Sequence, residues 1–396
     1  MRKLFLFLAL AVGLLTSAST AMAQTVNMSR YITLTVTNGA AIKLDFKAAA
    51  ANTPVRIVSG SNTQDITVGT GWTANAYYTA GSTTMTICGD LIGFDCEMNR
   101  ANLTALDPSH NTQLTKLSCR SNSLSRLDVS KNTQLTMLNC SNDSLNSLDI
   151  SQNTQLKYLN CSENQLTTLD VSGCTQLDGL YCYDNTLNSL DVSGCTQLTT
   201  LWCYDNPLNS LNLSNNTQLT VLNCKNNNLS SLDVSKNTQL TTLYCHGNNL
   251  STQALDDIFC ALPDRTGKES GVIQPVYSDT SSNHAIVLAT NKANAIDKNW
   301  KVQYYNHNND IATTGSYVCP TTDIAEATAE QALTLYPNPV ADVLYLSATA
   351  RTIRIYDIYG IEVAHATDTD RIDVAYLPAG VYTVKADGTV AKMVKR

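Results

Sequence analysis

The chain has 396 residues, a net charge of −7 and only 15% charged residues. It is too long for one ordinary compact domain, so several segments are expected. The one basic cluster is the terminal segment 392–396, and no basic stripe runs through the chain, which excludes a surface that neutralises nucleic-acid phosphates.

The first 23 residues have the features of a signal peptide. Arg2 and Lys3 precede an apolar run over 4–15, and Ala-Met-Ala at 21–23 fits the small-x-small cleavage pattern. No later stretch approaches the roughly 20 apolar residues that a spanning helix needs. We therefore expect 1–23 to be removed and the remainder to be exported without a membrane-spanning helix.

Residues 24–90 are predicted to form a β-rich N-terminal cap. Alternating apolar and polar runs at 31–37, 42–46 and 55–58 are separated by Gly, Asn and Pro, which is typical of short strands joined by turns. A cap is needed because the repeat array that follows would otherwise expose apolar side chains and unpaired strand edges at its end.

In residues 91–250 a cysteine recurs every 21 residues. The copies share the pattern Leu-x-x-Leu-x-Cys-x-x-Asn/Asp-x-Leu and start at residues 91, 114, 135, 156, 177, 198, 219 and 240. A coil of 21 residues has room for a strand, a turn and an extended return, but hardly for a helix. The predicted fold class is therefore mainly β, with an eight-coil solenoid whose strands pair in parallel.

The leucines and the cysteine of each coil are predicted to point inward. One coil alone cannot offset the conformational entropy lost on ordering its residues, at roughly 1–2 kcal/mol each, so the coils must stack. The cysteines then form a column in the structural core: Cys96, Cys119, Cys140, Cys161, Cys182, Cys203, Cys224 and Cys245.

Three roles are open to this cysteine column: zinc ligand, disulfide or core filler. The chain has no Cys-x-x-Cys pair of the kind found in zinc sites, and disulfides between parallel buried side chains would need backbone distortion. Buried thiols are therefore favoured, and neither a metal nor a cofactor is expected. A Cys174–Cys195 bond remains open, and the sequence assigns no partner to Cys88, Cys260 or Cys319.

Two polar ladders accompany the cysteines. Asparagines lie where the chain leaves each strand, interrupted once by Asp143, and should bond buried backbone groups. Aspartates recur in Leu-Asp-Val/Ile-Ser, where backbone N–H groups of the next turn should compensate their charge, with a bound cation such as calcium as the alternative. The asparagines are Asn122, Asn164, Asn185, Asn206, Asn227 and Asn248, and the aspartates are Asp128, Asp149, Asp170, Asp191 and Asp233.

The residues on either side of each cysteine should point out of the sheet, because side chains alternate along a strand. In the middle coils these positions hold aromatic residues bordered by acidic ones, a composition typical of interaction patches. The alternative is structural, since aromatic residues favour strands. The predicted ligand-binding residues are Tyr158, Tyr181, Tyr183, Trp202, Tyr204, Tyr244, Asp184 and Asp205, with Glu163 also on the rim.

After the array, 251–319 should form a C-terminal cap with a helix over 254–262 and a strand over 300–304. The segment 320–331 is rich in Ala, Thr and Glu and is predicted to be a linker. In 332–396, alternating runs at 333–339, 344–346, 353–360 and 377–385 are punctuated by Pro and Gly, which predicts a small antiparallel β-sandwich.

Two resemblances follow from these motifs. The repeat pattern over 91–250 resembles the cysteine-ladder repeats of the internalin J type among leucine-rich-repeat surface proteins, which implies a secreted, adhesin-like bacterial protein without a catalytic centre. The motif order in 332–396, with its basic end, resembles the C-terminal sorting domain of the type IX secretion system. This second resemblance implies export across the outer membrane by that machinery, proteolytic removal of 332–396, and attachment of the remainder to the cell surface through lipopolysaccharide.

The function expected from the sequence is that of a non-enzymatic adhesin on the bacterial cell surface. It would bind a host or bacterial surface protein or glycan through the exposed sheet and contribute to adhesion or biofilm formation. A self-associating surface-layer or matrix protein is the first alternative, and an enzyme in a flanking cap is the second. No nucleophile motif supports the enzyme, and the histidines are scattered singly: they are His110, His246, His284, His307 and His365.

Overall fold

The computed structural model describes residues 25–320, 334–357, 361–387 and 389–396. The chain divides into two compact units, Met1–Cys319 and Pro320–Arg396. The predicted signal peptide 1–23 lies outside the described residues, as does the predicted linker 320–331 apart from Pro320.

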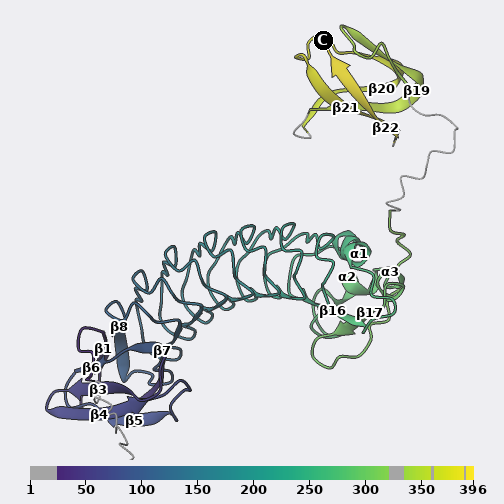
Figure 1. Ribbon diagram of the computed structural model, residues 1–396. Coiled ribbons are helices and arrows are strands. Elements are labelled where there is room, and N and C mark those ends of the chain that lie inside the picture. Colours follow the sequence, from purple (N-terminus) through teal and green to yellow (C-terminus); the bar gives the residue numbers. More distant parts are fainter. Residues whose placement is uncertain (1–24, 321–333, 358–360, 388) are drawn as a thin grey trace, which may run out of the picture. The chain divides into compact units, whose positions relative to one another are not determined.

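The middle of the first unit is a stack of coils (Figure 1), and the short strands of these coils form a parallel sheet. Equivalent residues pair in register, so that Leu138 lies between Leu117 and Leu159. The parallel solenoid predicted from the repeat is therefore confirmed. Its eight strands are β7 (Leu91–Asp95), β9 (Lys116–Ser118), β10 (Met137–Asn139), β11 (Tyr158–Asn160), β12 (Gly179–Tyr181), β13 (Thr200–Trp202), β14 (Val221–Asn223) and β15 (Thr242–Tyr244).

Each coil contributes a similar slice of core. The leucines at the coil starts and strand centres are fully buried, and every member of the cysteine column is buried and free. Burying one leucine contributes about 1.5–3 kcal/mol. The coils above and below supply the walls that make this burial complete, so stability depends on the stack.

A second ladder of buried asparagines, which was not predicted, lies on the opposite side of each coil. Asn153 is typical: its Nδ2 donates to the carbonyl oxygens of Val129 (3.0 Å) and Asn132 (2.9 Å) in the preceding coil. Cys174 and Cys195 occupy the same column and are both buried and free. The Cys195 thiol lies 3.5 Å from the Val171 carbonyl oxygen, so it replaces the amide donor, and the Cys174–Cys195 disulfide that the sequence left open is not formed.

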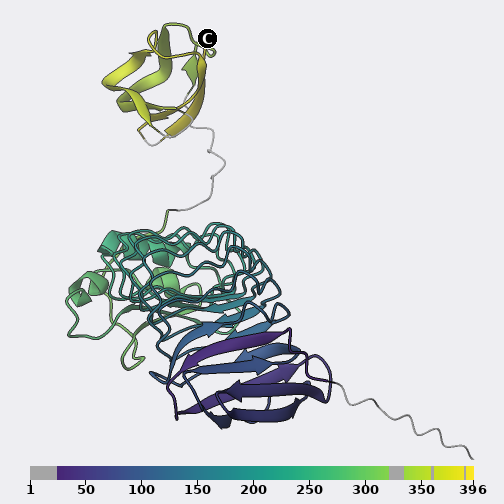
Figure 2. The ribbon, with the colours of Figure 1, turned by 90° about the vertical axis from the view of Figure 1, so that its left-hand side faces the viewer.

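The N-terminal cap shares its sheets with the solenoid. Its strand β2 pairs antiparallel with β7 and extends the solenoid sheet to β5, while β4, β3, β6 and β1 form a second sheet that ends on β8 (Leu103–Asp107) of the first coil. Cap and coils therefore have one continuous hydrophobic core, and Figure 2 shows the cap strands at the end of the stack. The cap strands are β1 (Tyr31–Val36), β2 (Ala41–Ala48), β3 (Thr53–Ser59), β4 (Asn62–Val68), β5 (Ala76–Thr79) and β6 (Thr84–Cys88).

At the other end, the parallel sheet continues beyond the repeats. β16 (Gly271–Val276) pairs in parallel with β15, and β17 (Trp300–Tyr304) pairs in parallel with β16. The sequence predicted only the second of these strands. Beside them lie α1 (Thr252–Ala261), α2 (His284–Leu288) and α3 (Ala293–Ile296).

Helix α1 begins two residues earlier than predicted. The Ser251 hydroxyl accepts a hydrogen bond from the backbone N–H of Ala254 (3.1 Å), which caps the helix N-terminus. A disulfide joins Cys260 in α1 to Cys319, a pairing that the sequence could not assign. Among the described residues, no helix is both long enough and apolar enough to cross a membrane.

The second unit is an antiparallel β structure with its own core, which confirms the class predicted for this segment. Its longest strand, β19, pairs with β18 and β20 over its first half and with β20 and β21 over its second. This change of partner lets one strand serve two layers. The strands are β18 (Leu335–Tyr336), β19 (Val343–Tyr356), β20 (Glu362–Asp373), β21 (Gly380–Ala386) and β22 (Thr389–Lys395).

Candidate binding surface

Five aromatic side chains from three neighbouring coils form a continuous group on the outer face of the solenoid sheet. We call this group the aromatic strip; its members are Tyr158, Tyr181, Tyr183, Trp202 and Tyr204. Tyr181 and Trp202 end paired strands and face each other in register, with ring centroids 5.3 Å apart. Tyr183 and Tyr204 stack at 4.3 Å.

Gly179 leaves room for the strip. It pairs with Tyr158 on one side and Thr200 on the other, in the middle of the aromatic coils. A Cβ atom at this position would lie 3.2 Å from the Tyr181 ring and 3.5 Å from the Tyr158 ring. A side chain larger than a methyl group would therefore push the two rings away from their present contact.

The rings of the strip are half-buried, because each covers part of its neighbour. Tyr183 and Tyr204 turn their faces toward each other, with an interplanar angle of 7°. The Trp202 Nε1 is buried and has no hydrogen-bond partner among the described residues. What the strip offers to a ligand is therefore mainly ring edges and hydroxyl groups.

The hydroxyls of Tyr158, Tyr181 and Tyr204 in the strip remain protonated at physiological pH. Burial raises the pKa of Tyr158 and of Tyr181 above the ordinary value. Burial also raises the pKa of Tyr204, and the neighbouring Tyr183 raises it further. A neutral phenol can both donate and accept a hydrogen bond, which suits a polar contact with a partner.

Lys225 extends the strip toward the C-terminal cap. Its Nζ lies 4.5 Å from the ring centroid of Tyr204 and 5.1 Å from that of Tyr305, both within cation–π range. Tyr305 in turn contacts Tyr277 at 5.8 Å. The sequence prediction missed Tyr277 and Tyr305, because they lie outside the repeats and reach this face only through β16 and β17.

Tyr244 belongs to a second aromatic group, which it forms with Tyr277 and Tyr305, and not to the strip. Its ring centroid lies 5.8 Å from that of Tyr305, and β14 separates it from Trp202. His246 is also here, 4.4 Å from the Tyr305 ring. Burial, and then the charge of Lys225, lowers the pKa of His246 to about 4, so Lys225 is the cation between the two aromatic groups at physiological pH.

The predicted acidic rim, Glu163, Asp184 and Asp205, occupies one column of turn residues. Their φ angles are 54°, 51° and 51°, in the left-handed region that short polar residues and glycine tolerate best. Asn226 and Gly247 hold the same position in later coils, with φ of 51° and 69°. Local backbone geometry therefore favours Asp, Asn or Gly at this position, Glu163 is the longer exception, and the three acidic residues add negative charge in the middle coils.

The rim also contacts the strip and its surroundings. The Tyr183 hydroxyl donates to Glu163 Oε1 (3.3 Å), and Asn226 Nδ2 donates to Asp205 Oδ1 (2.7 Å). Asp184 is exposed and Asp205 is partly exposed. Of the eight residues predicted from the sequence, seven thus lie in or beside the strip, and Tyr244 lies one coil beyond Lys225.

The cysteine column and the aspartate ladder have little reactive chemistry. Burial raises the pKa of Cys161 and Cys224 to about 12, so the thiolate that acts as nucleophile or metal ligand is scarce at physiological pH. In the aspartate ladder, Asp149 Oδ1 accepts from the backbone N–H of Ser151 (2.9 Å), and this bond lowers its pKa. Within the described parts of the chain, no group of three or more side chains is arranged to hold a metal ion.

Comparison with known proteins identifies the second unit. Residues 334–396 match the family model of the secretion system C-terminal sorting domain. The chain therefore carries a sorting domain of the type IX system and is exported by that system to the cell surface. A search of curated protein sequences gives no match to this chain.

Several solved structures are similar to parts of this chain. The functional domain of InlJ from Listeria monocytogenes, which includes a cysteine ladder, is 24% identical with a TM-score of 0.39, over 77% of this chain and 67% of that one. A leucine-rich-repeat protein from Leptospira interrogans is 25% identical with a TM-score of 0.37, over 39% of this chain and 42% of its own length. An internalin, InlF, from Listeria monocytogenes is 17% identical with a TM-score of 0.36, over 55% and 76%. This chain thus spans less than half of the Leptospira protein. The leucine-rich-repeat fold of this chain is evident from its own 21-residue period and its in-register parallel strands.

Proposed function

We propose that this chain is a non-enzymatic adhesin on the cell surface and that the aromatic strip binds its ligand. The observation that carries the proposal is the contiguous contact of five partly exposed aromatic side chains in the middle of the sheet. Aromatic residues supply large contact areas at a small cost in conformational entropy, and clusters of them dominate the binding energy of many interfaces.

A protein ligand suits the strip better than a glycan does. Sugar rings stack on open aromatic faces, whereas Tyr183 and Tyr204 cover each other and Lys225 lies over Tyr204. The exposed edges and hydroxyls, with Asp184 and Asp205 beside them, suit a protein surface that presents basic side chains.

The proposal includes attachment to the cell surface through lipopolysaccharide after the sorting domain is removed. It is supported by the match of 334–396 to a sorting domain and by the separate cores of the two units, since the first unit keeps its own core without the second. Mass spectrometry of protein released from cells should find a chain that ends before residue 334 and carries a lipopolysaccharide adduct. An unmodified chain that retains its C-terminus would contradict this part.

Replacing Trp202 and Tyr204 together with alanine tests the adhesive role. We expect loss of these two interface side chains to weaken ligand binding about 30-fold or more, because a single hot-spot residue contributes about 2 kcal/mol or more. The mature wild-type chain is probed on an array of host and bacterial surface proteins and glycans. The affinity for each hit is then measured for the wild type and for the double variant. Trp72→Ala, which removes a partly exposed tryptophan of the N-terminal cap, is the matched control.

Two outcomes would count against this function. Unchanged affinity of the Trp202 and Tyr204 variant for the protein hits, with the fold intact by circular dichroism, would remove the strip as the binding site. Growth of large species with protein concentration in sedimentation velocity, without saturable binding to any array member, would favour the self-associating matrix protein instead.

A further inference from the structure

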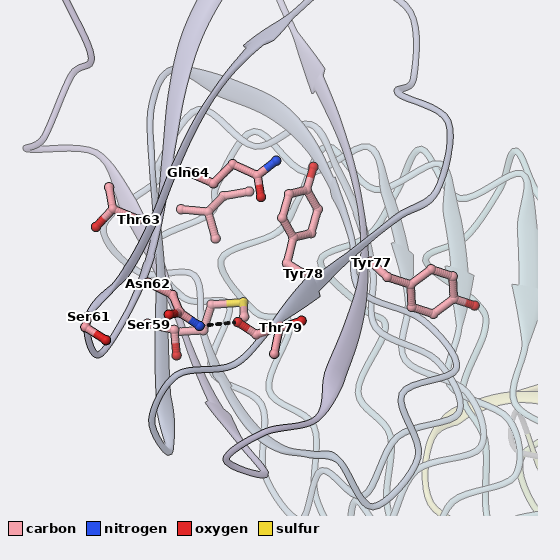
Figure 3. Close-up of a pocket in the computed structure, with 10 residues that line it drawn as sticks. Ser59, Ser61, Asn62, Thr63, Gln64, Tyr77, Tyr78 and Thr79 are labelled. Carbon is pink, nitrogen blue, oxygen red and sulfur yellow. Dashed lines mark hydrogen bonds between the residues drawn. The ribbon is translucent and has the colours of Figure 1, made fainter.

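A pocket of about 470 Å³ lies in the N-terminal cap between the β3–β4 hairpin and β5 (Figure 3). This volume falls within the roughly 300–1,000 Å³ of small-molecule sites. None of the residues that line the pocket is charged. Most of them supply hydroxyl or amide groups, including Ser59, Ser61, Asn62, Thr63, Gln64 and Thr79.

The contacts at one end of the pocket hold its two walls together. Asn62 Nδ2 donates to the Thr79 carbonyl oxygen (3.1 Å), and Ser59 Oγ accepts from the backbone N–H of Gly81 (3.1 Å). Residue 81 must be glycine for this close approach, because a Cβ atom there would lie 2.3 Å from the Ser59 carbonyl oxygen. The pocket is therefore preformed, which reduces the entropy lost on binding a ligand.

Both walls of the pocket are edge strands. β4 ends the five-stranded sheet and β5 ends the twelve-stranded sheet. In the part of the chain that the structure describes, no further strand pairs with their outer edges. Backbone N–H and C=O groups on these edges therefore add donors and acceptors to those of the side chains.

Tyr78 directs a hydroxyl group into the space between these walls. Tyr78 as a whole is 7% exposed, and its ring packs against that of Phe46, with centroids 6.0 Å apart. Its hydroxyl group forms no hydrogen bond with the described residues, and its oxygen atom remains accessible from the pocket. Figure 3 shows Tyr78 and Gln64 pointing toward one another, whereas Tyr77 points away.

We propose that this pocket binds a neutral sugar unit of a glycan. Sugar hydroxyls both donate and accept hydrogen bonds, as do the hydroxyl and amide groups that face them here. An anionic ligand would meet no cation among the lining residues, and a cationic ligand would meet no carboxylate. Ile57 and Met85 also line the pocket but are buried, so the surface that a ligand meets is mainly polar.

An extended peptide is the other ligand that edge strands attract, by adding a strand to a sheet. Here the Asn62 side chain bridges to Thr79 across the gap between the two edges. The bridge closes the path that a continuous strand would follow, so the pocket favours a compact ligand over a peptide.

The test uses two variants that each remove one hydroxyl from adjacent residues of β5, Tyr78→Phe and Tyr77→Phe. The full mature chain is titrated by ligand-observed NMR with methyl glycosides of glucose, galactose and mannose, with N-acetylglucosamine, and with glucuronate as the anionic comparison. We expect at least one neutral sugar to bind more tightly than glucuronate. Tyr78→Phe should weaken that binding about fivefold through loss of one hydrogen bond, and Tyr77→Phe by less than about twofold.

Gln64→Ala provides a second variant at an exposed position, so that a folding defect in Tyr78→Phe does not decide the result. Absence of binding by every neutral sugar, or equal affinity in the wild type, Tyr78→Phe and Gln64→Ala, would overturn the proposal. So would binding of an extended peptide at this pocket in place of a sugar. The Trp202 and Tyr204 variant should bind the sugar as the wild type does, so failure of either site leaves the other standing.

Discussion

Asp143 stands in a column where neighbouring coils have asparagine. Its Oδ1 accepts from the backbone N–H groups of Asn122 and Leu124, at 3.1 Å each, as the Oδ1 of Asn164 does from Leu145 (3.0 Å) in the next coil. Its Oδ2 is buried and has no partner among the described residues, whereas the amide of an asparagine there would donate to cysteine carbonyls. Burial raises the pKa of Asp143 to about 7.

Replacing Asp143 with asparagine should stabilise the protein at neutral and alkaline pH. The carboxyl group ionises near 3.8 when unfolded but near 7 when folded, so the stability of the wild type falls as the pH rises between these values. The asparagine variant avoids this loss, which is at most about 4 kcal/mol above pH 7. Below about pH 4 both states of the wild type are protonated, and the pH-dependent advantage disappears.

Urea unfolding of both proteins at pH 4 and pH 8 measures this difference. Ser144→Ala, at the exposed next residue, is the control and should show no such pH dependence. An equal change in stability between pH 4 and pH 8 for the wild type and Asp143→Asn would show that folding does not raise the pKa of this carboxyl group.

At the scale of one coil, the buried asparagine joins each turn to the next. Asn185 Nδ2 donates to the carbonyl oxygens of Cys161 in the preceding coil (3.1 Å) and Cys182 in its own coil (3.2 Å). Its Oδ1 accepts from the backbone N–H of Leu166 (2.9 Å). These backbone groups lie in the interior, where water cannot replace a lost partner.

Asn185→Ala should therefore lower the free energy of unfolding by roughly 2–5 kcal/mol, because it leaves several buried backbone groups without a partner. Asn188→Ala, three residues along at an exposed position, should change it by less than about 0.5 kcal/mol. Chemical denaturation followed by circular dichroism measures both. Similar stability of the two variants would mean that the ladder is dispensable.

The repeated elements were predictable because each coil has the same pattern, and the in-register pairing of Leu117, Leu138 and Leu159 follows from the constant 21-residue spacing. β16 was missed because Gly271–Val276 does not follow the repeat, although it occupies the next place in the sheet. The pairing of β2 with β7 could not be predicted from the sequence either, because the two segments share no pattern and their pairing depends on which edge of the sheet the cap covers.

At the scale of the whole molecule, the chain consists of two units with separate cores. The second unit contains the sorting domain, so removing residues 334–396 should stop export while the first unit still folds. Cell fractionation should then find the truncated protein in the periplasm, because it does not cross the outer membrane. Thermal unfolding of the purified truncated protein should retain the main transition, and surface display of the truncated chain would contradict the role of this domain.

The candidate surface was predictable in part. Alternation along the strands placed Tyr181, Tyr183, Trp202 and Tyr204 outward, next to the buried cysteines. It did not indicate that Tyr244 would pack with Tyr305 instead, since that contact requires the C-terminal cap to extend the sheet.

The repeat alone specifies the solenoid, its buried leucine and cysteine columns and the direction of the outward residues, because a constant period makes every coil repeat the same register. Packing between distant segments sets how the outward rings stack, places Lys225 between Tyr204 and Tyr305, and brings β4 and β5 to the two sides of a pocket. The physical reason is that a local period specifies contacts between adjacent coils. Ring orientation and the approach of distant segments depend instead on packing around them, which no local pattern encodes.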